Sequence, residues 1–295
     1  MSKLFKTDPE LDAFKMNYLR ECKENKNNMS FWLDALTGSC LTIPETTILQ
    51  LDFPIILPSW QDEKKREKLQ RASIQNPEVP VMEWLLCDRY YDEDIEAFTK
   101  LALSKLACEP SLRAWVEGRE QGTKFLKTGN FSNKFSFNNC CRLEDPQKIG
   151  KQFLDIMYAG LCVGCMPSPE LVIREFIETT YTRPEIYDGM KLNTEYRAFY
   201  DFDNNRALDI FNYWDRDTME RGLYCRGDLE TFDSVTSEIE ADFREHKYLV
   251  TEELKKLKGI NLQGTWSVDF LWSGEKMYLI DMALAENSYY FNRVR

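Results

Sequence analysis

This chain of 295 residues is 43% hydrophobic and 13% aromatic, which predicts a globular protein with a substantial buried core. Its formal net charge of −11 excludes a general nucleic-acid surface, because phosphate backbones require a basic patch. No run approaches the roughly 18 apolar residues of a membrane span, and nine cysteines, an odd number, favour reduced thiols, so we expect a cytoplasmic protein without membrane contact.

Residues 1–120 show mixed helical and extended patterns without a strong chemical motif. Periodicity and apolar runs predict helices over 8–22, 61–73 and 92–106, and strands over 47–51 and 80–87. The helix over 61–73 is highly charged, which is typical of a solvated face. We therefore interpret residues 1–120 as a smaller N-terminal α/β region that precedes the main fold.

The segment after residue 120 contains two lysines around a loop. A short predicted strand, residues 123–128, carries Lys127 and runs into the turn-rich segment from Gly129 to Phe135, which carries Lys134. Loop amides and two ammonium groups in this arrangement would suit the phosphates of a nucleotide. The alternative is that both lysines are simply solvated, since neither a G-x-x-x-x-G-K-[ST] nor a G-x-G-x-x-G pattern occurs.

The middle of the chain alternates between strands and helices. The predicted elements are a helix over 145–161, strands over 171–178, 193–202 and 206–214, and a helix over 232–258. In the strand over 193–202, alternation places Glu195, Arg197 and Phe199 on one face. A buried Arg197 requires an anionic partner, which is either a bound anion or a carboxylate such as Glu195 or Glu175.

Histidine and cysteine usage limits the chemistry further. His246 is the only histidine, so a Ser-His-Asp triad or a His-rich metal site is excluded in practice. Cys162 and Cys165 have the spacing of a metal or redox pair, and Cys140-Cys141 lies upstream. A four-thiolate zinc site can be drawn from them, but adjacent cysteines pair poorly on zinc, and buried free thiols are the interpretation that we favour.

The C-terminal stretch, residues 263–287, predicts a β-hairpin. The runs TWSVDFLW and MYLID flank turn-forming residues, and each run carries one carboxylate, Asp269 and Asp281. A two-residue loop would put the two carboxylates on opposite faces of the hairpin. A three-residue loop over 273–275, with Gly274 in the left-handed conformation, would put both on one face.

The three-residue loop pairs Asp269 with Leu279 and Ser267 with Asp281. Two unpaired carboxylates on one buried face would repel each other and lose hydration, and a hard cation such as magnesium would relieve both penalties. The alternative is that one or both acids face water at the edge of the sheet.

Taken in order, these segments resemble the ATP-grasp superfamily. The likeness rests on FLKTGNFSNKF, VIREFIE, EYRAFY and the hairpin runs WSVDFLW and MYLID, with an Ile-Pro-Glu-Thr segment before them. Within the superfamily the sequence is most similar to the cell-division-cycle-type assembly chaperone family of translation initiation factor two, and also to small phage and bacterial ATP-grasp proteins. The resemblance implies an α+β fold in which two subdomains grip ATP, a lid and hinge over about 121–178 and a catalytic subdomain over about 179–295.

The resemblance also implies roles for individual residues. Lys127 would contact the α- and β-phosphates, Lys134 on the lid would add charge, and Arg197 would meet the γ-phosphate or an acyl phosphate. Asp269 and Asp281 would hold magnesium. The implied nucleotide hinge, with Glu178 on the ribose and the rest near the adenine edge, comprises Arg174, Glu175, Phe176, Ile177 and Glu178.

One position departs from the family pattern. The asparagine that normally follows the second acid by two residues is replaced by Ala283, so Asn287 or Glu286 would have to complete the metal site. The resemblance implies an ATP-dependent carboxylate-amine ligase that acts through an acyl phosphate on unknown carboxylate and amine substrates. Its alternatives are an ATP-bound assembly chaperone that clamps a protein partner, and a lapsed enzyme that binds no nucleotide.

Overall fold

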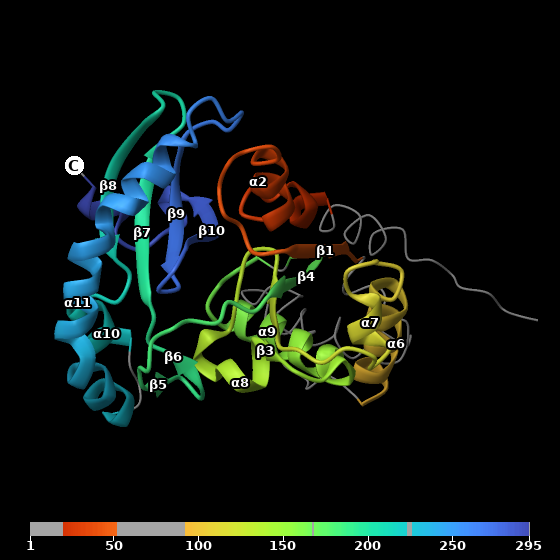
Figure 1. The fold of residues 1–295 in the computed structure, drawn as a ribbon. Coiled ribbons are helices and arrows are strands. Elements are labelled where there is room, and N and C mark those ends of the chain that lie inside the picture. The colour runs from red at the N-terminus through yellow and green to blue at the C-terminus, as the bar shows by residue number, and fades with distance from the viewer. Residues whose placement is uncertain (1–19, 52–91, 167, 223–225, 295) are drawn as a thin grey trace, which may run out of the picture.

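The computed structural model describes residues 20–51, 92–166, 168–222 and 226–294. The predicted helix over 61–73 and the predicted strand over 80–87 lie outside these residues, as does most of the predicted helix over 8–22. The other elements form two antiparallel four-stranded sheets with helices packed against them (Figure 1). The predicted α+β class is therefore confirmed.

The first sheet has the strand order β1-β4-β2-β3. Its strands are β1 (Thr46–Gln50), β2 (Lys124–Thr128), β3 (Arg142–Leu143) and β4 (Glu170–Glu175). Two helices, α6 (Asp92–Leu106) and α9 (Ile149–Cys162), pack together through Phe98 and Phe153, whose rings stack at 4.9 Å between centroids. Leu126, Leu171 and Ile173 project into the same buried cluster, which holds these helices against one face of the sheet.

The second sheet has the strand order β10-β9-β7-β8. Its strands are β7 (Thr194–Asp201), β8 (Arg206–Asn212), β9 (Thr265–Trp272) and β10 (Met277–Leu284). The long helix α11 (Arg226–Lys255) contributes Val250 and Leu254 to a buried cluster with Tyr196 and Phe270 of the sheet. Because side chains alternate along a strand, the residues between these apolar ones project from the opposite face.

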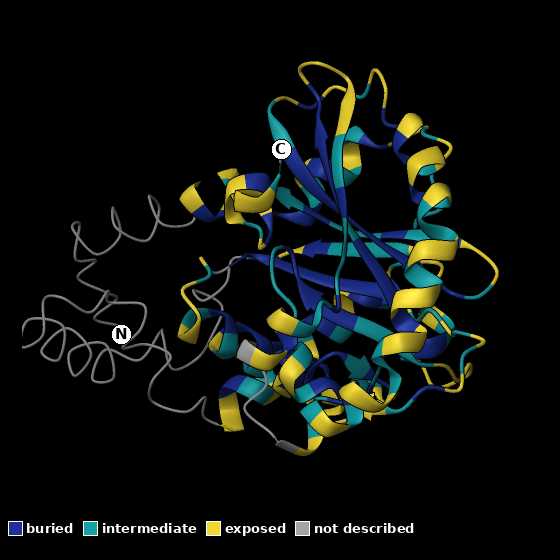
Figure 2. Ribbon diagram, turned by 90° about the vertical axis from the view of Figure 1, so that its left-hand side faces the viewer, coloured by how far each residue is buried: buried dark blue, intermediate teal, exposed yellow. Residues whose placement is uncertain are grey.

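The N-terminal part of the described chain joins the two sheets. Helix α2 (Met29–Ala35) buries Trp32 in the cluster of the second sheet, while the following β1 pairs with β4 of the first sheet. The amide of Leu279 on β10 donates to the carbonyl of Thr42 at 2.9 Å. Figure 2 shows the strands mostly buried and the outward faces of the helices mostly exposed.

Several short elements complete the description. They are α7 (Arg113–Val116), η1 (Lys134–Ser136), α8 (Phe137–Cys140), η2 (Pro146–Lys148), β5 (Glu185–Ile186), β6 (Met190–Lys191), α10 (Arg216–Gly222), η3 (Ala285–Asn287) and η4 (Phe291–Arg293). No helix in the described part of the chain combines the length and hydropathy needed to span a bilayer.

Most predicted elements are observed with small shifts of their ends. The predicted helix over 92–106 matches α6, and the predicted helix over 232–258 overlaps α11. The strand predicted over 171–178 ends earlier, at Glu175, because the chain leaves the sheet there. Strands β5 and β6 were not predicted, since their link through Tyr187 and Asp188 uses positive φ angles that non-glycine residues seldom adopt. The boundaries near residues 120 and 178 stay predictions.

Candidate functional site

A row of three charged side chains crosses the second sheet. Arg197 on β7 pairs with Asp269 on β9, and Asp269 pairs with Asp281 on β10. Residues that pair across antiparallel strands project from the same face, so all three side chains point away from α11. Glu195, two positions before Arg197, projects from this face as well. The second sheet thus has one apolar face and one charged face.

The hairpin loop is longer than predicted. Trp272 pairs with Met277, so the loop comprises the four residues 273–276 rather than three. The hydroxyl of Ser273 accepts hydrogen bonds from the amides of Glu275 and Lys276, at 3.3 and 3.1 Å, which fixes the turn. Gly274 has a φ of +96°, so the predicted positive φ at this glycine is confirmed.

A β-bulge, and not the loop, brings the two carboxylates to one face. After a four-residue loop an unbroken ladder would pair Asp269 with Ile280 and turn Asp281 to the opposite face. The register shifts between Leu279 and Asp281, which leaves Ile280 as the inserted residue and pairs the two aspartates directly. The predicted pairs of Asp269 with Leu279 and of Ser267 with Asp281 are therefore wrong, whereas the common face is observed.

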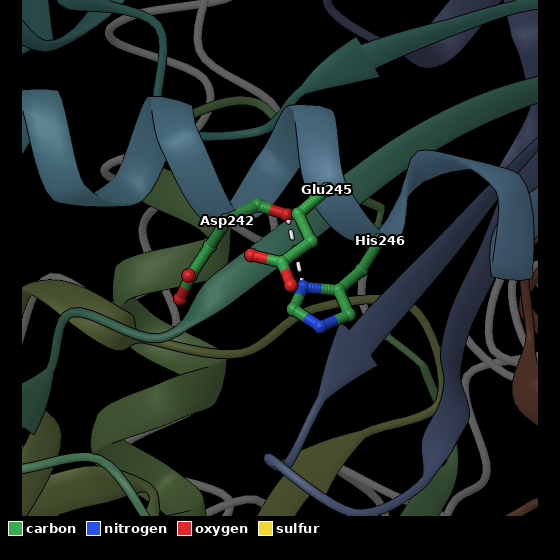
Figure 3. A group of neighbouring side chains, drawn as sticks. All are labelled: Asp242, Glu245 and His246. Carbon is green, nitrogen blue, oxygen red and sulfur yellow. Dashed lines mark hydrogen bonds between the residues drawn. The ribbon is translucent and has the colours of Figure 1, made fainter.

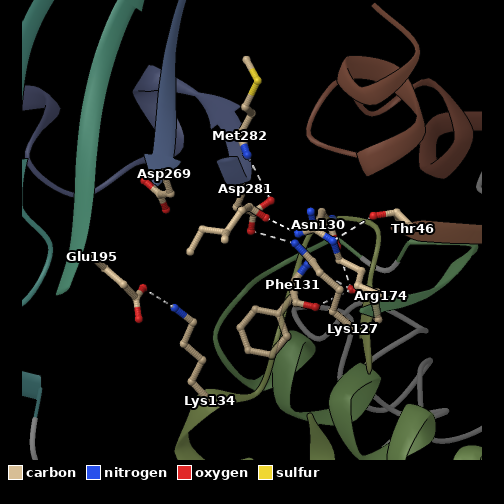
Figure 4. A network of polar contacts seen from close by, with 12 residues as sticks. Thr46, Lys127, Asn130, Phe131, Lys134, Arg174, Glu195, Asp269, Asp281 and Met282 are labelled. Carbon is tan, nitrogen blue, oxygen red and sulfur yellow. Dashed lines mark hydrogen bonds and ion pairs between the residues drawn. The ribbon is translucent and has the colours of Figure 1, made fainter. Parts of the chain in front are cut away.

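Two ion pairs join the charged face to the first sheet (Figure 4). The Nζ of Lys127 on β2 lies 2.7 Å from Oδ2 of Asp281. The Nζ of Lys134, on η1 after the loop, lies 3.2 Å from Oε2 of Glu195. The side chain of Lys127 is only 2% exposed, so Asp281 is the group that compensates a buried ammonium.

Arg197 holds Asp269 through two parallel hydrogen bonds. Its Nε donates to Oδ1 at 2.8 Å and its Nη2 donates to Oδ2 at 2.6 Å, the bidentate geometry that guanidinium groups favour. The carboxylates that the sequence suggested as its alternatives, Glu195 and Glu175, are not these partners. In the structure, therefore, both aspartates of the row neutralise a cation of the site.

Burial and pairing shift several pKa values in this cluster. Burial raises the pKa of Glu195, although the nearby ammonium of Lys134 opposes the change. Burial, the largest single effect, would lower the pKa of Lys134, but the combined attraction of Glu195, Tyr213 and Asp269 outweighs it and raises this pKa. For Arg197, burial is likewise outweighed by the charge and hydrogen bonds of Asp269, which raise its pKa. Lys134 and Arg197 are thus charged throughout the physiological range.

Arg174 presents a buried guanidinium with spare hydrogen-bonding capacity. Its Nε donates to the hydroxyl of Thr46 at 3.0 Å and its Nη1 donates to the carbonyl of Ile280, yet its buried Nη2 has no partner among the residues that the structure describes. Burial lowers the pKa of Arg174 to about 10, an effect that the charge of Asp281 partly opposes. A buried unpaired donor on a cationic side chain is costly, so this position fits a bound anion.

A cavity of about 410 Å³ lies between the two sheets and collects the charged groups described above. Six cationic side chains line it, among them Lys127, Lys134, Arg174 and Arg197, together with six carboxylates, among them Glu195, Asp269 and Asp281. Its volume falls in the range of roughly 300–1,000 Å³ that is usual for small-molecule sites.

The other end of this cavity lies where β4 ends and holds most of its apolar side chains, although Arg142 lies over the ring of Phe176 there. Phe125, Phe137, Met190 and Leu271 line it beside Phe176, Ile177 and Glu178 of the predicted hinge. The rings of Phe137 and Phe176 meet edge to face, 6.2 Å apart between centroids. Within the described residues, the backbone groups of 176–178 make no hydrogen bond, since the pairing of β2 with β4 stops at Glu175. Free backbone groups therefore face a slot with aromatic walls.

The structure brings every predicted site residue but one to this cavity. The exception is Asn287, which lines a second cavity of about 380 Å³. Asp269 and Asp281 line both cavities, so Asn287 lies on the far side of the two carboxylates from the hinge. Its role as a third metal ligand stays a prediction.

Tyr213 is a contact residue that the sequence did not single out. Its ring lies 4.5 Å from Nζ of Lys134 and 4.8 Å from Cζ of Arg197, measured to the ring centroid. Both cations therefore face its π-system. Its position can be inferred once strand pairing is known, because its amide donates to the carbonyl of Glu195 and so extends β8 along β7.

A separate cluster of titratable groups lies on α11 (Figure 3). Asp242, Glu245 and His246 approach one another closely enough to hold a cation. However, the carboxylate of Asp242 is already paired with Arg183, and the ring of His246 stacks on Trp272 at 4.7 Å between centroids. We therefore interpret the cluster as a means of fastening α11 to the rest of the fold.

The cysteines do not form the zinc site that could be drawn from the sequence. Cys140 and Cys141 are buried, as expected of free thiols, and burial raises the pKa of both. Cys162 is exposed, so the expectation of burial is wrong for this residue. No group of metal-ligating side chains that includes a cysteine is found among the described residues.

The fold is similar to several solved structures. One is Cdc123 from Schizosaccharomyces pombe, with 13% identity and a TM-score of 0.45 over 95% of this chain and 92% of that one. Another is D-alanyl-alanine synthetase A from Vibrio cholerae O1 biovar eltor str. N16961, with 10% identity and a TM-score of 0.29 over 88% and 55% of the two chains. A third is the RimK domain protein ATP-grasp from Sphaerobacter thermophilus DSM 20745, with 11% identity and a TM-score of 0.31 over 92% and 60%.

Of these three structures, the RimK domain protein is the one whose name contains the term ATP-grasp. With TM-scores below 0.5 they assign neither an activity nor a substrate to this chain. The chain spans little more than half the length of the two bacterial proteins. No family model matches the sequence, and no curated protein matches it either.

Proposed function

We propose that the cavity between the sheets binds ATP with magnesium, and that the protein is an ATP-dependent carboxylate-amine ligase that acts through an acyl phosphate. The observation that carries this proposal is the polarity of a single cavity. One end is an aromatic slot beside free backbone groups, and the other holds four cationic side chains and two aspartates aligned on neighbouring strands. A nucleotide has the same division between an apolar, hydrogen-bonding base and a charged polyphosphate.

At the apolar end the base would lie between aromatic side chains such as Phe125 and Phe176. The backbone of residues 176–178 would donate to and accept from its edge, as directional groups without partners do. Glu178 is exposed at the same rim and would accept hydrogen bonds from the ribose hydroxyls.

At the charged end the cations would exchange partners. Lys127 and Arg197 now neutralise Asp281 and Asp269, and phosphate oxygens would take over both cations while the aspartates hold the metal. The unpaired Nη2 of Arg174 would gain an acceptor. Lys134 would add charge above the phosphates from its place beside Tyr213.

The aspartate pair fits a hard divalent cation. Asp269 and Asp281 supply carboxylate oxygens from adjacent strands, the donor type that magnesium prefers, and Asn287 would complete the set from the second cavity. Magnesium would neutralise charge on the phosphate oxygens when bound. The cationic side chains would position the phosphates and neutralise their charge. Each such electrostatic donor is worth about 3–4 kcal/mol of transition-state stabilisation.

The reaction needs no protein nucleophile. A substrate carboxylate oxygen would attack the γ-phosphorus, and the bond to the β,γ-bridging oxygen would break, so that ADP leaves with the electron pair. An amine would then attack the carbonyl carbon of the acyl phosphate, expel inorganic phosphate with its electron pair and lose one proton to base or solvent. Arg197, which lines both cavities, would stabilise the transferring phosphoryl group.

A second function, an ATP-bound clamp for a protein partner, is favoured by two observations. Ala283 occupies the place where a third metal ligand is expected, and both aspartates have cationic partners already. Weak metal binding of this kind suits a protein that holds ATP without fast turnover. A ligase should release ADP in a manner that depends on added carboxylate, whereas a clamp should bind ATP and release none.

The binding proposal is tested by equilibrium dialysis of labelled ATP with magnesium. Arg197→Gln should weaken binding at least tenfold, because it removes a cation of the phosphate end. Arg206→Gln, on β8 and with a side chain 67% exposed, should leave binding unchanged. Equal affinity of the wild type and Arg197→Gln would refute the placement of the phosphates.

A further inference from the structure

The second cavity shares a wall with the first. Six residues line both: Ser132, Lys134, Arg197, Tyr213, Asp269 and Asp281. These residues include the cations that we place near the γ-phosphate. A molecule in the second cavity would therefore meet the nucleotide at the charged row of the second sheet.

Aromatic side chains make up much of the rest of the second cavity, beside polar ones such as Asn130 and Asn287. Its walls include Phe131, Phe135, Tyr187, Trp214, Tyr289 and Tyr290. The rings of Phe135 and Tyr187 meet edge to face, 4.9 Å apart between centroids, and those of Tyr289 and Tyr290 do so at 4.7 Å. The first pair joins η1 to the link between β5 and β6, and the second lies near the C-terminal end, so three segments far apart in the sequence supply the aromatic walls.

The mouth of this cavity exposes two of these rings to solvent. Phe135 is 53% exposed and Tyr289 is 46% exposed. Exposed large aromatic side chains around a concave surface are typical of binding sites, because a ligand that covers them removes apolar area from water. The mouth is thus apolar while the shared wall is charged.

The charged side chains on the shared wall determine which charge a ligand of the second cavity would carry and where. Lys134 and Arg197 both face the ring of Tyr213 on this wall. If magnesium occupies Asp269 and Asp281, as the proposed function requires, Arg197 loses its present carboxylate partner. An anionic group of the ligand would then lie beside Arg197, with the body of the ligand against the aromatic rings.

We propose that the second cavity binds a carboxylate that is attached to an aromatic or large apolar side chain, such as the C-terminus of a peptide that ends in phenylalanine or tyrosine. This inference rests on the proposed function for the direction of the carboxylate, and it names the class of substrate that the ligase would activate. The same chemistry is offered by a free N-acylated amino acid and by a peptide terminus.

The test is a calorimetric titration of the full chain with three probes, in the presence of magnesium and a non-hydrolysable ATP analogue. N-acetyl-phenylalanine should bind at least tenfold more tightly than N-acetyl-glycine, and at least tenfold more tightly than N-acetyl-phenylalanine amide, which lacks the charge. A further probe, the tripeptide Gly-Gly-Phe, represents the C-terminus of a peptide. Tighter binding of Gly-Gly-Phe than of N-acetyl-phenylalanine assigns the site to peptide termini, and the reverse order assigns it to free amino acids.

Two variants at the mouth of the second cavity test the inference without changing the buried core. Phe135→Ala and Tyr289→Ala alter exposed side chains, and each should weaken N-acetyl-phenylalanine binding about fivefold or more. Tyr248→Ala on α11, where the ring is 62% exposed, is the matched control and should change nothing. Equal affinities for the phenylalanine and glycine probes, or no effect of either variant, would overturn the inference.

Failure of this inference can be separated from failure of the proposed function. Binding of the ATP analogue is measured first in the same samples. If the analogue binds and N-acetyl-phenylalanine does not, the substrate class is wrong and the nucleotide site stands. If N-acetyl-phenylalanine binds in a manner that depends on Phe135 while the analogue does not, the nucleotide site is wrong and the aromatic cavity stands.

Discussion

The Nζ of Lys127 lies 2.7 Å from Oδ2 of Asp281, although these residues belong to different sheets and are 154 positions apart in the chain. The lysine side chain is 2% exposed and the aspartate side chain is 38% exposed. The pair joins the two halves of the candidate nucleotide site. Together with the pair of Arg197 and Asp269, it gives each of the two aspartates proposed to hold magnesium a cationic partner.

The two partners of this ion pair should respond unequally to substitution. Asp281→Asn leaves a buried ammonium without compensation and should lower the free energy of unfolding by about 3 kcal/mol. Lys127→Met leaves a carboxylate that water already reaches, and its effect should be about 1 kcal/mol or less. Urea denaturation measures both values.

A matched control exists on α9. Asp155 pairs with Lys151 and is also 38% exposed, but that lysine is 65% exposed. Asp155→Asn should therefore change the free energy of unfolding by less than about 0.5 kcal/mol. Equal losses in Asp281→Asn and Asp155→Asn would contradict the view that Lys127 is a buried cation held by Asp281.

Arg174 should show a conflict between stability and ligand binding. Burial lowers its pKa to about 10, so the folded state disfavours the charged form. The unfolded chain then binds more protons than the folded chain between pH 10 and the ordinary arginine pKa of about 12.5. The contribution of Arg174 to the free energy of unfolding should therefore increase as the pH rises from about 10 to about 12.5.

Replacing Arg174 tests this conflict at neutral pH. Arg174→Met removes the charge that burial disfavours, so it should leave the thermal midpoint unchanged or raise it slightly while weakening ATP binding at least tenfold. Loss of the bonds to Thr46 and Ile280 limits the gain in stability. A variant that binds ATP as well as the wild type would show that Arg174 does not serve the phosphates.

Tyr213 should act through its ring and not through its hydroxyl. The ring faces both Lys134 and Arg197, and each such contact is worth about 0.5–2 kcal/mol. Tyr213→Phe should keep ATP affinity within about twofold, whereas Tyr213→Leu should weaken it roughly fivefold to tenfold. Titration calorimetry on both variants distinguishes the ring from the hydroxyl, because only the leucine variant lacks the π-system.

The hairpin tip should control the segment that follows the hinge. The amide of Thr180 donates to the carbonyl of Ser273 at 2.9 Å, and a Cβ added at Gly274 would lie 1.8 Å from the Thr180 hydroxyl. Gly274→Ala should therefore lower the free energy of unfolding by about 2–3 kcal/mol, through backbone strain and this overlap together.

Gly164 provides the comparison for Gly274. It also has a positive φ, of +80°, but an added Cβ there would meet nothing within 4 Å. Gly164→Ala should lose only about 1 kcal/mol, from the backbone strain alone. If the two alanine variants are equally stable, the hairpin tip does not press on Thr180.

Much of this architecture could be predicted from the sequence, but the way in which the two aspartates meet could not. Alternation along the strand placed Glu195 and Arg197 on one face, as observed. The common face of Asp269 and Asp281, however, depends on a bulge at Ile280, and bulges leave no clear signal in a short apolar run. The loop length alone gives the wrong register.

The ion-pair partners of the cationic side chains could not be predicted from the sequence either. Arg197 bonds to Asp269 because β7 and β9 are neighbours in the sheet, and Lys134 reaches Glu195 because the loop after β2 packs over the second sheet. Both contacts depend on tertiary arrangement. Local patterns can identify charged residues that need partners, but they do not fix which partner lies nearest.

The most direct test is a thermal-shift titration with ATP, with magnesium and with both, on the wild type and on Asp281→Asn. Because the site is already neutralised by its own ion pairs, magnesium alone and ATP alone should have little effect. Magnesium and ATP together, at 100 times the dissociation constant, should add about 2.7 kcal/mol, which shifts the midpoint of the wild type by at least about 2 °C. The shift should be absent in Asp281→Asn; an equal shift in that variant, or no shift in the wild type, would contradict a nucleotide site between the two sheets.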